Sequence, residues 1–429
     1  MPDNLPCPVQ ATRRPYRYAQ PLPCPAASVG CCLPMMQSPR LAMGACLLAI
    51  FTTIFASHLP TPLYAVWQQA WGFSSTALTA VFSVYVLGVV LTLLTMGSLS
   101  DQIGRRQMVI PGLLFILVGS TLFMFASNIN HLGVARLITG IGTGLVTGAA
   151  TAAVVEMMTD GNWARGATFA ALAFTLGASL GPTTSSLALR WTSHAHVWPF
   201  LVVIALVLLC LILLLKAPWP AGLGQRHPDF RLRKWRPTPI KVPRPLLGVF
   251  VFAASAICLA WSTGSLYSSL GPSMARELAG VSDLALAGLF AAGWQLVAGI
   301  TQFAAQRQPL TRLILAGPLL LIMGLAAMAG AVLLGSVWLF TLATVMTATG
   351  AGTIGVIATV TIARSAPPAE RGGMTSAFYL AAYLTMATVV LGLGFASDRL
   401  GMVNSMLGFT VLISLAAVAL MCTRRRVQP

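Results

Sequence analysis

The sequence predicts an all-α membrane protein of about twelve transmembrane helices arranged as two six-helix bundles. Of its 429 residues, 57% are hydrophobic and only 8% are charged, whereas soluble domains carry roughly 25% charged residues. The mean hydropathy is +0.81. Apolar runs recur along the whole chain, and basic residues collect in the short gaps between them. So few charges cannot cover a water-exposed surface, which excludes a soluble fold.

Each apolar run is predicted to be a helix, because about 20 mostly apolar residues cross some 30 Å of hydrocarbon. The strands of a β-barrel would instead be about ten residues long with alternating polarity. In chain order, the predicted helices cover residues 42–66, 75–97, 108–127, 132–156, 166–189, 196–216, 246–270, 283–304, 313–334, 337–362, 373–395 and 402–421.

The basic gaps predict the orientation of these helices. One alternating set of connections carries most of the Lys and Arg, including Arg105, Arg106 and the cluster within 217–245, and the other set carries few. Basic connections remain in the cytoplasm. We therefore expect a multi-pass protein of the cell inner (plasma) membrane with both termini in the cytoplasm. The net charge of +17 then reflects topology and does not indicate nucleic-acid binding.

Composition divides the chain into five segments. The N-terminal tail is predicted to be disordered and cytoplasmic, without a signal peptide; alternatively, translation begins at Met35 or Met36. The linker between the bundles is too polar to span a membrane, and its basic residues are expected to lie against anionic headgroups. The segments are the tail 1–40, the N-terminal bundle 41–216, the linker 217–245, the C-terminal bundle 246–421 and the basic tail 422–429.

The two halves resemble each other at three places. Ser74 and Ser282 are predicted to cap the helices that follow them. A duplicated half suits alternating access, in which two similar bundles rock about a central site. The matching segments are 72–78 with 280–286, Gly140-Ile141-Gly142-Thr143 with Gly350-Ala351-Gly352-Thr353, and Arg165-Gly166 with Arg371-Gly372.

The strongest motif lies between the second and third predicted helices, where the chain reads Gly97-Ser98-Leu99-Ser100-Asp101-Gln102-Ile103-Gly104-Arg105-Arg106. It resembles the major facilitator superfamily signature G-x-L-x-D-x-x-G-R-R/K, and all six signature positions match. The resemblance implies two bundles built from 3+3 inverted repeats. It also implies a loop that latches the cytoplasmic side in the outward-open state, formed by Gly97, Leu99, Asp101, Gly104, Arg105 and Arg106.

The chemistry of this loop is compatible with a latch. Gly97 permits close helix approach, and Gly104 permits a turn with positive φ. Asp101 can face a helix N-terminus, where the backbone dipoles favour an anion. Arg105 and Arg106 can pair with carboxylates or lipid phosphates. The alternative is a basic turn that only sets topology.

A second motif opens the fourth predicted helix, where Arg136 precedes Gly140, Gly142 and Gly144. It resembles the superfamily pattern R-x-x-x-G-x-G, with Thr139 in place of the usual Gln. A membrane-embedded arginine is costly unless it has a polar partner, so Arg136 is a candidate for the proton or substrate pathway. The alternative is that Arg136 extends to the outer headgroups.

Two further residues are candidates for proton coupling. Apart from Asp283 at the first position of another span, Glu156 is the only one of the nine acidic residues within a predicted span, and its alternative role is to pair with Arg105 or Arg165. His58 can titrate near neutral pH, and its alternative is an ordinary hydrogen bond to solvent. Many proton-linked exporters of the superfamily carry an acid in the first helix, and this chain has none there.

The fifth predicted helix contains Gly177, Gly181 and Pro182. This resembles the exchanger motif G-x-x-x-G-P-x-x-G-G, although Ser185 and Ser186 replace the final glycines. The resemblance implies efflux by exchange. The alternative is a packing kink, since small residues four apart bring helices close together.

Polar and aromatic residues within the spans are candidates for lining a substrate cavity. They would form an apolar pocket with few hydrogen-bonding groups, which suits amphiphilic drugs or aromatic metabolites better than sugars. Each could equally serve helix packing. The candidates are Thr52, Phe55, Trp261, Tyr267, Trp294, Gln295, Tyr379 and Tyr383.

Together these patterns predict a secondary active transporter that exports a small amphiphilic compound in exchange for protons. The alternative is a proton-coupled importer of a metabolite on the same fold. We expect no enzyme activity, cofactor or metal, because no P-loop, HExxH or GxSxG motif is present. The expected partners are a small-molecule substrate, protons and membrane lipid, with no nucleic acid, and the protein is expected to be a monomer.

Overall fold

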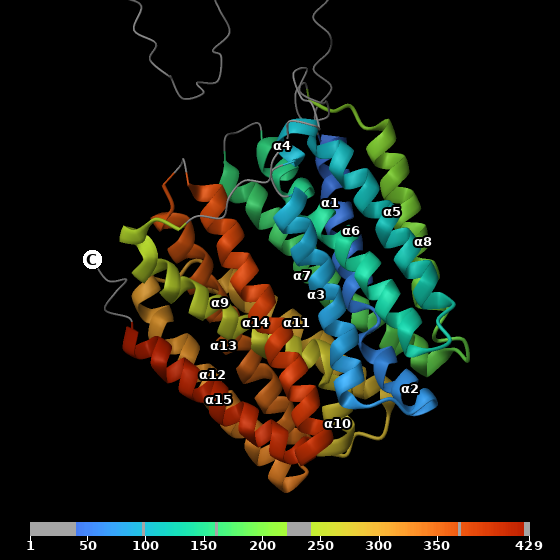
Figure 1. Ribbon diagram of the computed structural model, residues 1–429, viewed down its shortest axis with the longest axis vertical. Coiled ribbons are helices and arrows are strands. Elements are labelled where there is room, and N and C mark those ends of the chain that lie inside the picture. Colours follow the sequence, from blue (N-terminus) through green and yellow to red (C-terminus); the bar gives the residue numbers. More distant parts are fainter. Residues whose placement is uncertain (1–39, 97–98, 159–161, 221–241, 368–369, 424–429) are drawn as a thin grey trace, which may run out of the picture. The chain divides into compact units, whose positions relative to one another are not determined.

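Every element that the structure describes is helical, and the long helices lie side by side in two groups (Figure 1). The structure is a computed structural model. It describes residues 40–96, 99–158, 162–220, 242–367 and 370–423, except the side chains of Asp101, Ala164, Arg371 and Gly372. The predictions for the N-terminal tail, most of the linker, the last six residues, Gly97 and the Asp101 side chain lie outside this description.

The first group comes from the N-terminal half and the second from the C-terminal half, so the predicted two-bundle fold is confirmed. The N-terminal helices are α1 (Arg40–His58), α2 (Thr61–Trp71), α3 (Ser75–Met96), α4 (Ser100–Ile103), α5 (Arg105–Met124), α6 (Ile129–Glu156), α7 (Trp163–Trp191) and α8 (Trp198–Lys216). After the 3-10 turn η2 (Arg244–Leu246), the C-terminal helices are α9 (Leu247–Ser269), α10 (Gly271–Ala279), α11 (Leu284–Ala305), α12 (Leu310–Leu334), α13 (Val337–Ser365), α14 (Arg371–Leu400) and α15 (Met402–Cys422).

Within the described residues, eleven segments are long and apolar enough to cross a membrane. Helix α7 is not among these eleven, although it has 29 residues. It carries more Ser, Thr and Gly than its neighbours, which lowers its hydropathy without shortening it.

The first predicted helix, 42–66, is interrupted near one end, so predicting it as continuous was wrong, whereas the seventh, 246–270, matches α9 and is followed by the short helix α10. Pro60 follows α1, and α2 carries a further proline in its first turn, as does α10. Proline has no amide hydrogen and clashes with the preceding turn, so it ends a helix. Both short helices stop at a left-handed glycine, Gly72 with φ 64° and Gly280 with φ 66°. We call the end of the helices that carries these glycines the outer end, and the end that carries Gly104 the inner end, after the predicted orientation.

The caps of the helices correct two details of the predicted repeat. The side chain of Asn128 caps α6, and the side chain of Ser336, 208 positions later, caps α13. This register pairs Gly142 with Gly350, where the sequence comparison had paired Gly140 with Gly350. A methyl group at Gly142 would lie 2.7 Å from a backbone oxygen of α5, and one at Gly350 would lie 2.5 Å from a backbone nitrogen of α12. Equivalent helix pairs therefore meet at these two glycines.

The predicted caps at the start of α3 and α11 had different outcomes. The Ala77 amide donates to Ser74 Oγ over 3.1 Å, which confirms the first. The second was wrong, because Asp283 and not Ser282 accepts the amides of Ala285 and Leu286. A carboxylate caps a helix at least as well as a hydroxyl and is favoured by the helix dipole.

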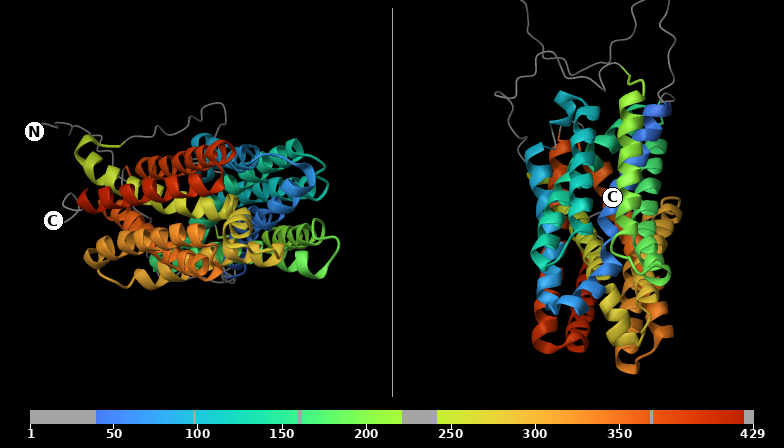
Figure 2. Two further views of the ribbon diagram at one scale, coloured as in Figure 1. Left: turned by 90° about the horizontal axis from the view of Figure 1, so that it is seen from below. Right: turned by 90° about the vertical axis from the view of Figure 1, so that its right-hand side faces the viewer.

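The two halves meet mainly where α3 packs against α14 and α7 packs against α11; Figure 2 shows the same division seen from the outer end. Polar contacts join the halves near that end. Thr61 Oγ1 donates to the Ser268 carbonyl over 3.0 Å, and Arg190 pairs with Asp283 at 2.9 Å. Among the described residues, the hydrogen bonds that join α1–α8 to α9–α15 lie between their middle and the outer end.

Candidate functional site

Arg136 lies inside the N-terminal half, with 1% of its surface exposed. Its Nε donates to the Tyr64 hydroxyl, and its Nη1 donates to the Ser57 carbonyl over 2.6 Å. The guanidinium carbon lies 5.2 Å from the ring centre of Tyr64, 5.3 Å from that of Tyr85 and 5.5 Å from that of Phe123. These are cation–π distances. The alternative position at the outer headgroups is therefore wrong.

No carboxylate among the described residues pairs with Arg136, which is also the only charged side chain buried within them. A buried cation is stable only where hydrogen bonds and polarisable groups replace water. The glycines that follow it help to build this surrounding, because a methyl group at Gly140 would collide with the Tyr85 carbonyl and one at Gly144 would lie 2.7 Å from Thr92 Cβ. Helices α3 and α6 can then approach closely enough to enclose the guanidinium.

The other two candidates for proton coupling lie in different places. Glu156 is the last residue of α6, and Arg105 donates to it over 2.7 and 3.2 Å. This is the ion pair that the sequence offered as the alternative to proton exchange. His58 Nδ1 lies 3.0 Å from the Ile54 carbonyl. His58 directly follows Ser57, whose carbonyl binds Arg136, so these two candidates lie close together.

Two arginines of the predicted latch loop, Arg105 and Arg106, bind other residues of the N-terminal half. Arg105 Nη1 donates to Ser100 Oγ over 2.6 Å, and Arg106 Nη2 donates to the Leu215 carbonyl over 3.1 Å. Gly104 has φ 96°, which confirms the predicted turn, and Leu99 is buried. Whether the loop acts as a latch stays a prediction.

Three of the predicted cavity residues lie together where the two halves meet. Trp261 lies with its ring centre 5.8 Å from that of Tyr379 and 4.8 Å from that of Tyr383. Trp261 and Tyr383 also pack against a cluster that contains Phe82 and Tyr85 from α3. We call these five residues the central aromatic cluster. It joins α3 of one half to α9 and α14 of the other.

The polar groups of this cluster have unused hydrogen-bonding capacity. Tyr379 and Tyr383 are only half-buried. Their hydroxyls, and that of Tyr85, make no hydrogen bond to any described residue. A tyrosine hydroxyl in an apolar setting usually finds a partner. These three hydroxyls are therefore available to a bound molecule, and the Tyr85 ring also contacts Arg136.

A second group of predicted cavity residues forms a closed network within the C-terminal half. Tyr267 stacks on Trp294 at 5.6 Å, and Trp294 Nε1 donates to Thr347 Oγ1 over 3.2 Å. Gln295 Nε2 donates to Ser268 Oγ over 3.0 Å. Because their polar atoms are already bonded, these residues support the helix packing next to the cluster.

The remaining two cavity candidates lie on α1, away from the cluster. Thr52 Oγ1 lies 3.5 Å from Cys210 Sγ and therefore faces α8. Phe55 is 3% exposed, and its ring contacts Phe51 at 5.6 Å. Both side chains therefore contact other residues of the N-terminal half. The spacing of residues along the sequence does not show which neighbouring helix a side chain faces.

The exchanger-like motif of α7 packs against α1. A methyl group at Gly177 would lie 2.6 Å from the Phe51 carbonyl, and one at Gly181 would lie 2.5 Å from the Phe55 carbonyl. The helix continues through Pro182. Ser185, which replaces the first of the missing glycines, donates to the Leu59 carbonyl over 2.6 Å. This bond satisfies a carbonyl at the break between α1 and α2, as a membrane interior requires.

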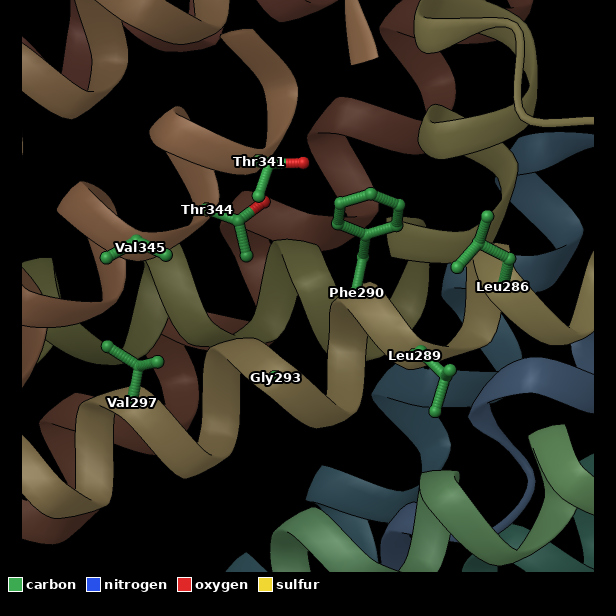
Figure 3. Close-up of a pocket in the computed structure, with 8 residues that line it drawn as sticks. All are labelled: Leu286, Leu289, Phe290, Gly293, Val297, Thr341, Thr344 and Val345. Carbon is green, nitrogen blue, oxygen red and sulfur yellow. The ribbon is translucent and has the colours of Figure 1, made fainter. Parts of the chain in front are cut away.

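An apolar groove lies between α11 and α13, with a volume of about 320 Å³ (Figure 3). Its two hydroxyls, on Thr341 and Thr344, donate to carbonyls of their own helix. The groove offers hydrocarbon surface and few free polar groups, so it does not resemble a specific substrate site. Its lining residues are Leu286, Leu289, Phe290, Gly293, Val297, Thr341, Thr344 and Val345.

Sequence reasoning missed the partners of Arg136, namely Tyr64 and Tyr85. One signal was available, because a buried arginine without nearby acids needs aromatic or carbonyl partners. The break after Pro60, which turns α2 so that Tyr64 faces Arg136, could not be located from hydropathy alone.

Two related helical halves, with an aromatic cluster between them and a buried arginine in the N-terminal half, define a polytopic membrane protein of the transporter type. The chain belongs to the Major Facilitator Superfamily, whose family model matches residues 46–390.

Solved structures show the same fold. A bacterial homologue of the human lysosomal transporter Spinster, in an inward-facing conformation, aligns with a TM-score of 0.72 over 91% of this chain and 98% of its own, at 14% identity. A POT family transporter in complex with 5-aminolevulinic acid aligns with a TM-score of 0.74 over 91% of this chain and all of its own, at 15% identity.

Proteins that are similar in sequence match only part of this chain. A putative multidrug resistance protein, MdtD, of Shigella boydii is 26% identical over 59% of this chain and 47% of its own. The chloramphenicol resistance protein CraA of Acinetobacter baumannii is 26% identical over 37% of this chain and 38% of its own. A gallate transporter of Pseudomonas putida is 30% identical over 30% of this chain and 28% of its own. The chain thus matches less than half the length of each of these relatives.

Proposed function

We propose that this protein exports a small amphiphilic aromatic compound in exchange for protons, by alternating access. The observation that carries the proposal is the central aromatic cluster. Both halves contribute to it, and it holds three tyrosine hydroxyls without a hydrogen-bond partner among the described residues. A compound bound there contacts both halves, so it is released when they rock apart. We place the protein in the inner membrane as a monomer with both termini in the cytoplasm.

The charge around the cluster favours neutral or anionic compounds over cations. Arg136 lies 5.3 Å from the Tyr85 ring. Every carboxylate among the described side chains lies at a helix end or in a connection, including Glu156, Glu277, Asp283, Glu370 and Asp398. A cationic substrate would therefore meet a buried positive charge without a compensating acid, which is unfavourable at low dielectric.

The position of the carboxylates also limits which side chains can carry the coupled proton. Without an interior carboxylate among these side chains, His58 is a titratable group close to Arg136, because it directly follows Ser57, whose carbonyl binds the guanidinium. The charged form of His58 would repel the neighbouring guanidinium, so a proton taken up there would act directly on Arg136. We propose that His58 takes up and releases the coupled proton, and that Arg136 links its charge to the tyrosines of the cluster.

Export is supported by the α7 motif of Gly177, Gly181 and Pro182, and by the relatives named for drug and chloramphenicol resistance. Import is the second candidate, because another relative is named as a gallate transporter. Both directions use the same site, and only a measurement of flux separates them.

The test is a susceptibility and accumulation screen in a host that lacks its own exporters. The panel holds neutral, anionic and cationic aromatic compounds of similar size. We expect expression of the chain to lower accumulation of one or more neutral or anionic compounds several-fold, and a protonophore to restore it. Increased accumulation would establish import. Selective loss of cations would contradict the proposed substrate class.

A matched pair of variants ties the result to the site. Trp261→Ala removes the ring at the centre of the cluster and should abolish the effect. Trp338→Ala removes a ring that is 82% exposed and should leave the effect unchanged. Equal activity of the two variants would place the substrate elsewhere.

A further inference from the structure

The end of α14 and the glycine that follows it repeat part of the sequence of the predicted latch loop and the conformation of its last glycine. The chain reads Gly394-Phe395-Ala396-Ser397-Asp398-Arg399-Leu400-Gly401 there. The latch loop reads Gly97-Ser98-Leu99-Ser100-Asp101-Gln102-Ile103-Gly104, so four of eight positions are identical: both glycines, the serine and the aspartate. The closing glycines share an unusual conformation, with φ 96° and ψ 143° at Gly104 and φ 82° and ψ 158° at Gly401. The similarity therefore extends from the sequence to the backbone conformation of the closing glycine.

The two segments lie at opposite ends of the helices. Gly104 follows the inner end of α3, whereas Gly401 follows the outer end of α14. These are the two helices that pack against each other across the halves. Similar segments, closed by a glycine of the same conformation, therefore lie at opposite ends of the two facing helices.

In this structure the outer copy is engaged with the opposite half. The two carboxylate oxygens of Asp398 accept the backbone amides of Ser75 and Thr76 over 2.8 and 2.7 Å. These amides belong to the first turn of α3, whose donors have no partner within the helix. The positive end of the helix dipole adds to the attraction. Hydrogen bonds of this length to a charged acceptor are among the strong ones.

The helix packing beside this contact is also close. A methyl group at Gly394 would collide with the Thr79 side chain of α3 and lie 2.7 Å from the Ser75 carbonyl. Further along the same interface, Ser83 Oγ donates to the Ala387 carbonyl over 3.3 Å. The carboxylate of Asp398 thus closes the outer end of an interface that is already tightly packed.

We propose that Asp398, in the last turn of α14 before Gly401, forms an outer latch, which holds the outer end closed by binding the N-terminus of α3. When the halves rock, this contact must break, because α3 and α14 separate at their outer ends. The inner loop with Asp101 would then close on α14 in the opposite state. The two aspartates, one at each end of the paired helices, would thereby set the ratio of outer-closed to inner-closed molecules.

The test measures two distances by pulsed electron–electron resonance on the full chain in nanodiscs, with native cysteines replaced. One pair of spin labels, at Ala70 and Asn404, reports on the outer end, and the other, at Trp163 and Gln308, reports on the inner end; all four side chains are exposed. Asp398→Asn and Asp398→Ala should raise the ratio of outer-open to outer-closed molecules at least about tenfold, since two charge-assisted bonds are weakened or lost. The outer distance should lengthen while the inner distance shortens.

Two controls separate a latch from general loosening. Glu277→Gln changes another acid near the outer end, one without a recorded ion pair to a described residue, and should leave both distances unchanged. Asp101→Asn should shift the populations in the direction opposite to Asp398→Asn. Unchanged outer distances in both Asp398 variants, or shifts of the same sign for Asp101 and Asp398, would overturn the proposal. If the alanine variant is unstable, the near-isosteric asparagine variant decides. No substrate is needed, so the result is independent of the proposed export activity.

Discussion

At the scale of single residues, Arg136 is the least replaceable side chain in the described part of the chain. It is held by the Tyr64 hydroxyl, the Ser57 carbonyl and three aromatic faces. No carboxylate neutralises it there. A charge in such a setting is stable only in one arrangement of its neighbours, so a change in those neighbours alters its energy strongly.

We predict that Arg136→Ala abolishes transport while the protein still reaches the membrane. The variant leaves the Ser57 carbonyl and the Tyr64 hydroxyl without their donor, and it removes the only buried charge of the described residues. Tyr64→Phe removes one hydrogen bond and keeps the ring, so it should reduce transport about tenfold or less. Flux per unit of protein in membrane vesicles checks both. Activity of Arg136→Ala near that of wild type would show that the arginine is only structural.

The hydroxyls of the central aromatic cluster are predicted to choose among substrates. Tyr379→Phe and Tyr383→Phe keep the rings and should retain transport of the most apolar compounds. Transport of compounds with hydrogen-bonding groups should fall, by about 5- to 15-fold for each lost bond, as expected for 1 to 1.5 kcal/mol. Competition assays between two substrates give this ratio directly. A uniform loss for all compounds would indicate a packing role.

At the scale of elements, close contacts between helices depend on glycines that face backbone. Gly177 and Gly181 let α7 lie against α1, and Gly142 and Gly350 do the same for equivalent helix pairs in the two halves. Such contacts replace the hydrophobic effect, which does not drive association between helices in lipid. The glycines were visible in the sequence, but which helix each one faces was not.

We predict that Gly181→Ala destabilises the protein and that Gly148→Ala does not. The added methyl group would lie 2.5 Å from the Phe55 carbonyl in the first variant and has nothing within 4 Å in the second. Overpacking costs about 1–3 kcal/mol, whereas alanine in an open helical position is favoured by about 1 kcal/mol over glycine. Thermal unfolding in detergent should therefore move to lower temperature only for Gly181→Ala. Equal midpoints for the two variants would contradict the packing assigned to α7.

At the scale of the whole molecule, hydropathy predicted the order of the long helices and their division into two bundles. It could not place the break after α1, because a proline interrupts a helix without interrupting the apolar run. It also misjudged which cavity candidates face the interface, since Thr52 faces α8 whereas Trp261 faces α3 and α14. Sequence spacing fixes which side of a helix a residue occupies, but not what lies on that side.

The repeat between the halves shows the same limit. Matching motifs placed Gly140 opposite Gly350, and the caps at Asn128 and Ser336 shift this register by two residues. In the corrected register Arg136 corresponds to Thr344, so the C-terminal half lacks a counterpart of the buried charge. The site is therefore built asymmetrically on a symmetric scaffold, with the charge in one half and most of the aromatic rings in the other.

The central claim is that proton-driven flux passes the central aromatic cluster, whose Tyr85 contacts Arg136. The most direct test is accumulation of a labelled neutral aromatic compound in everted membrane vesicles under an imposed pH gradient, acidic inside. We predict accumulation that collapses on addition of a protonophore, falls at least about tenfold in Trp261→Ala, and persists in Trp338→Ala. Accumulation that survives the protonophore, or that Trp261→Ala leaves unchanged, would contradict the account.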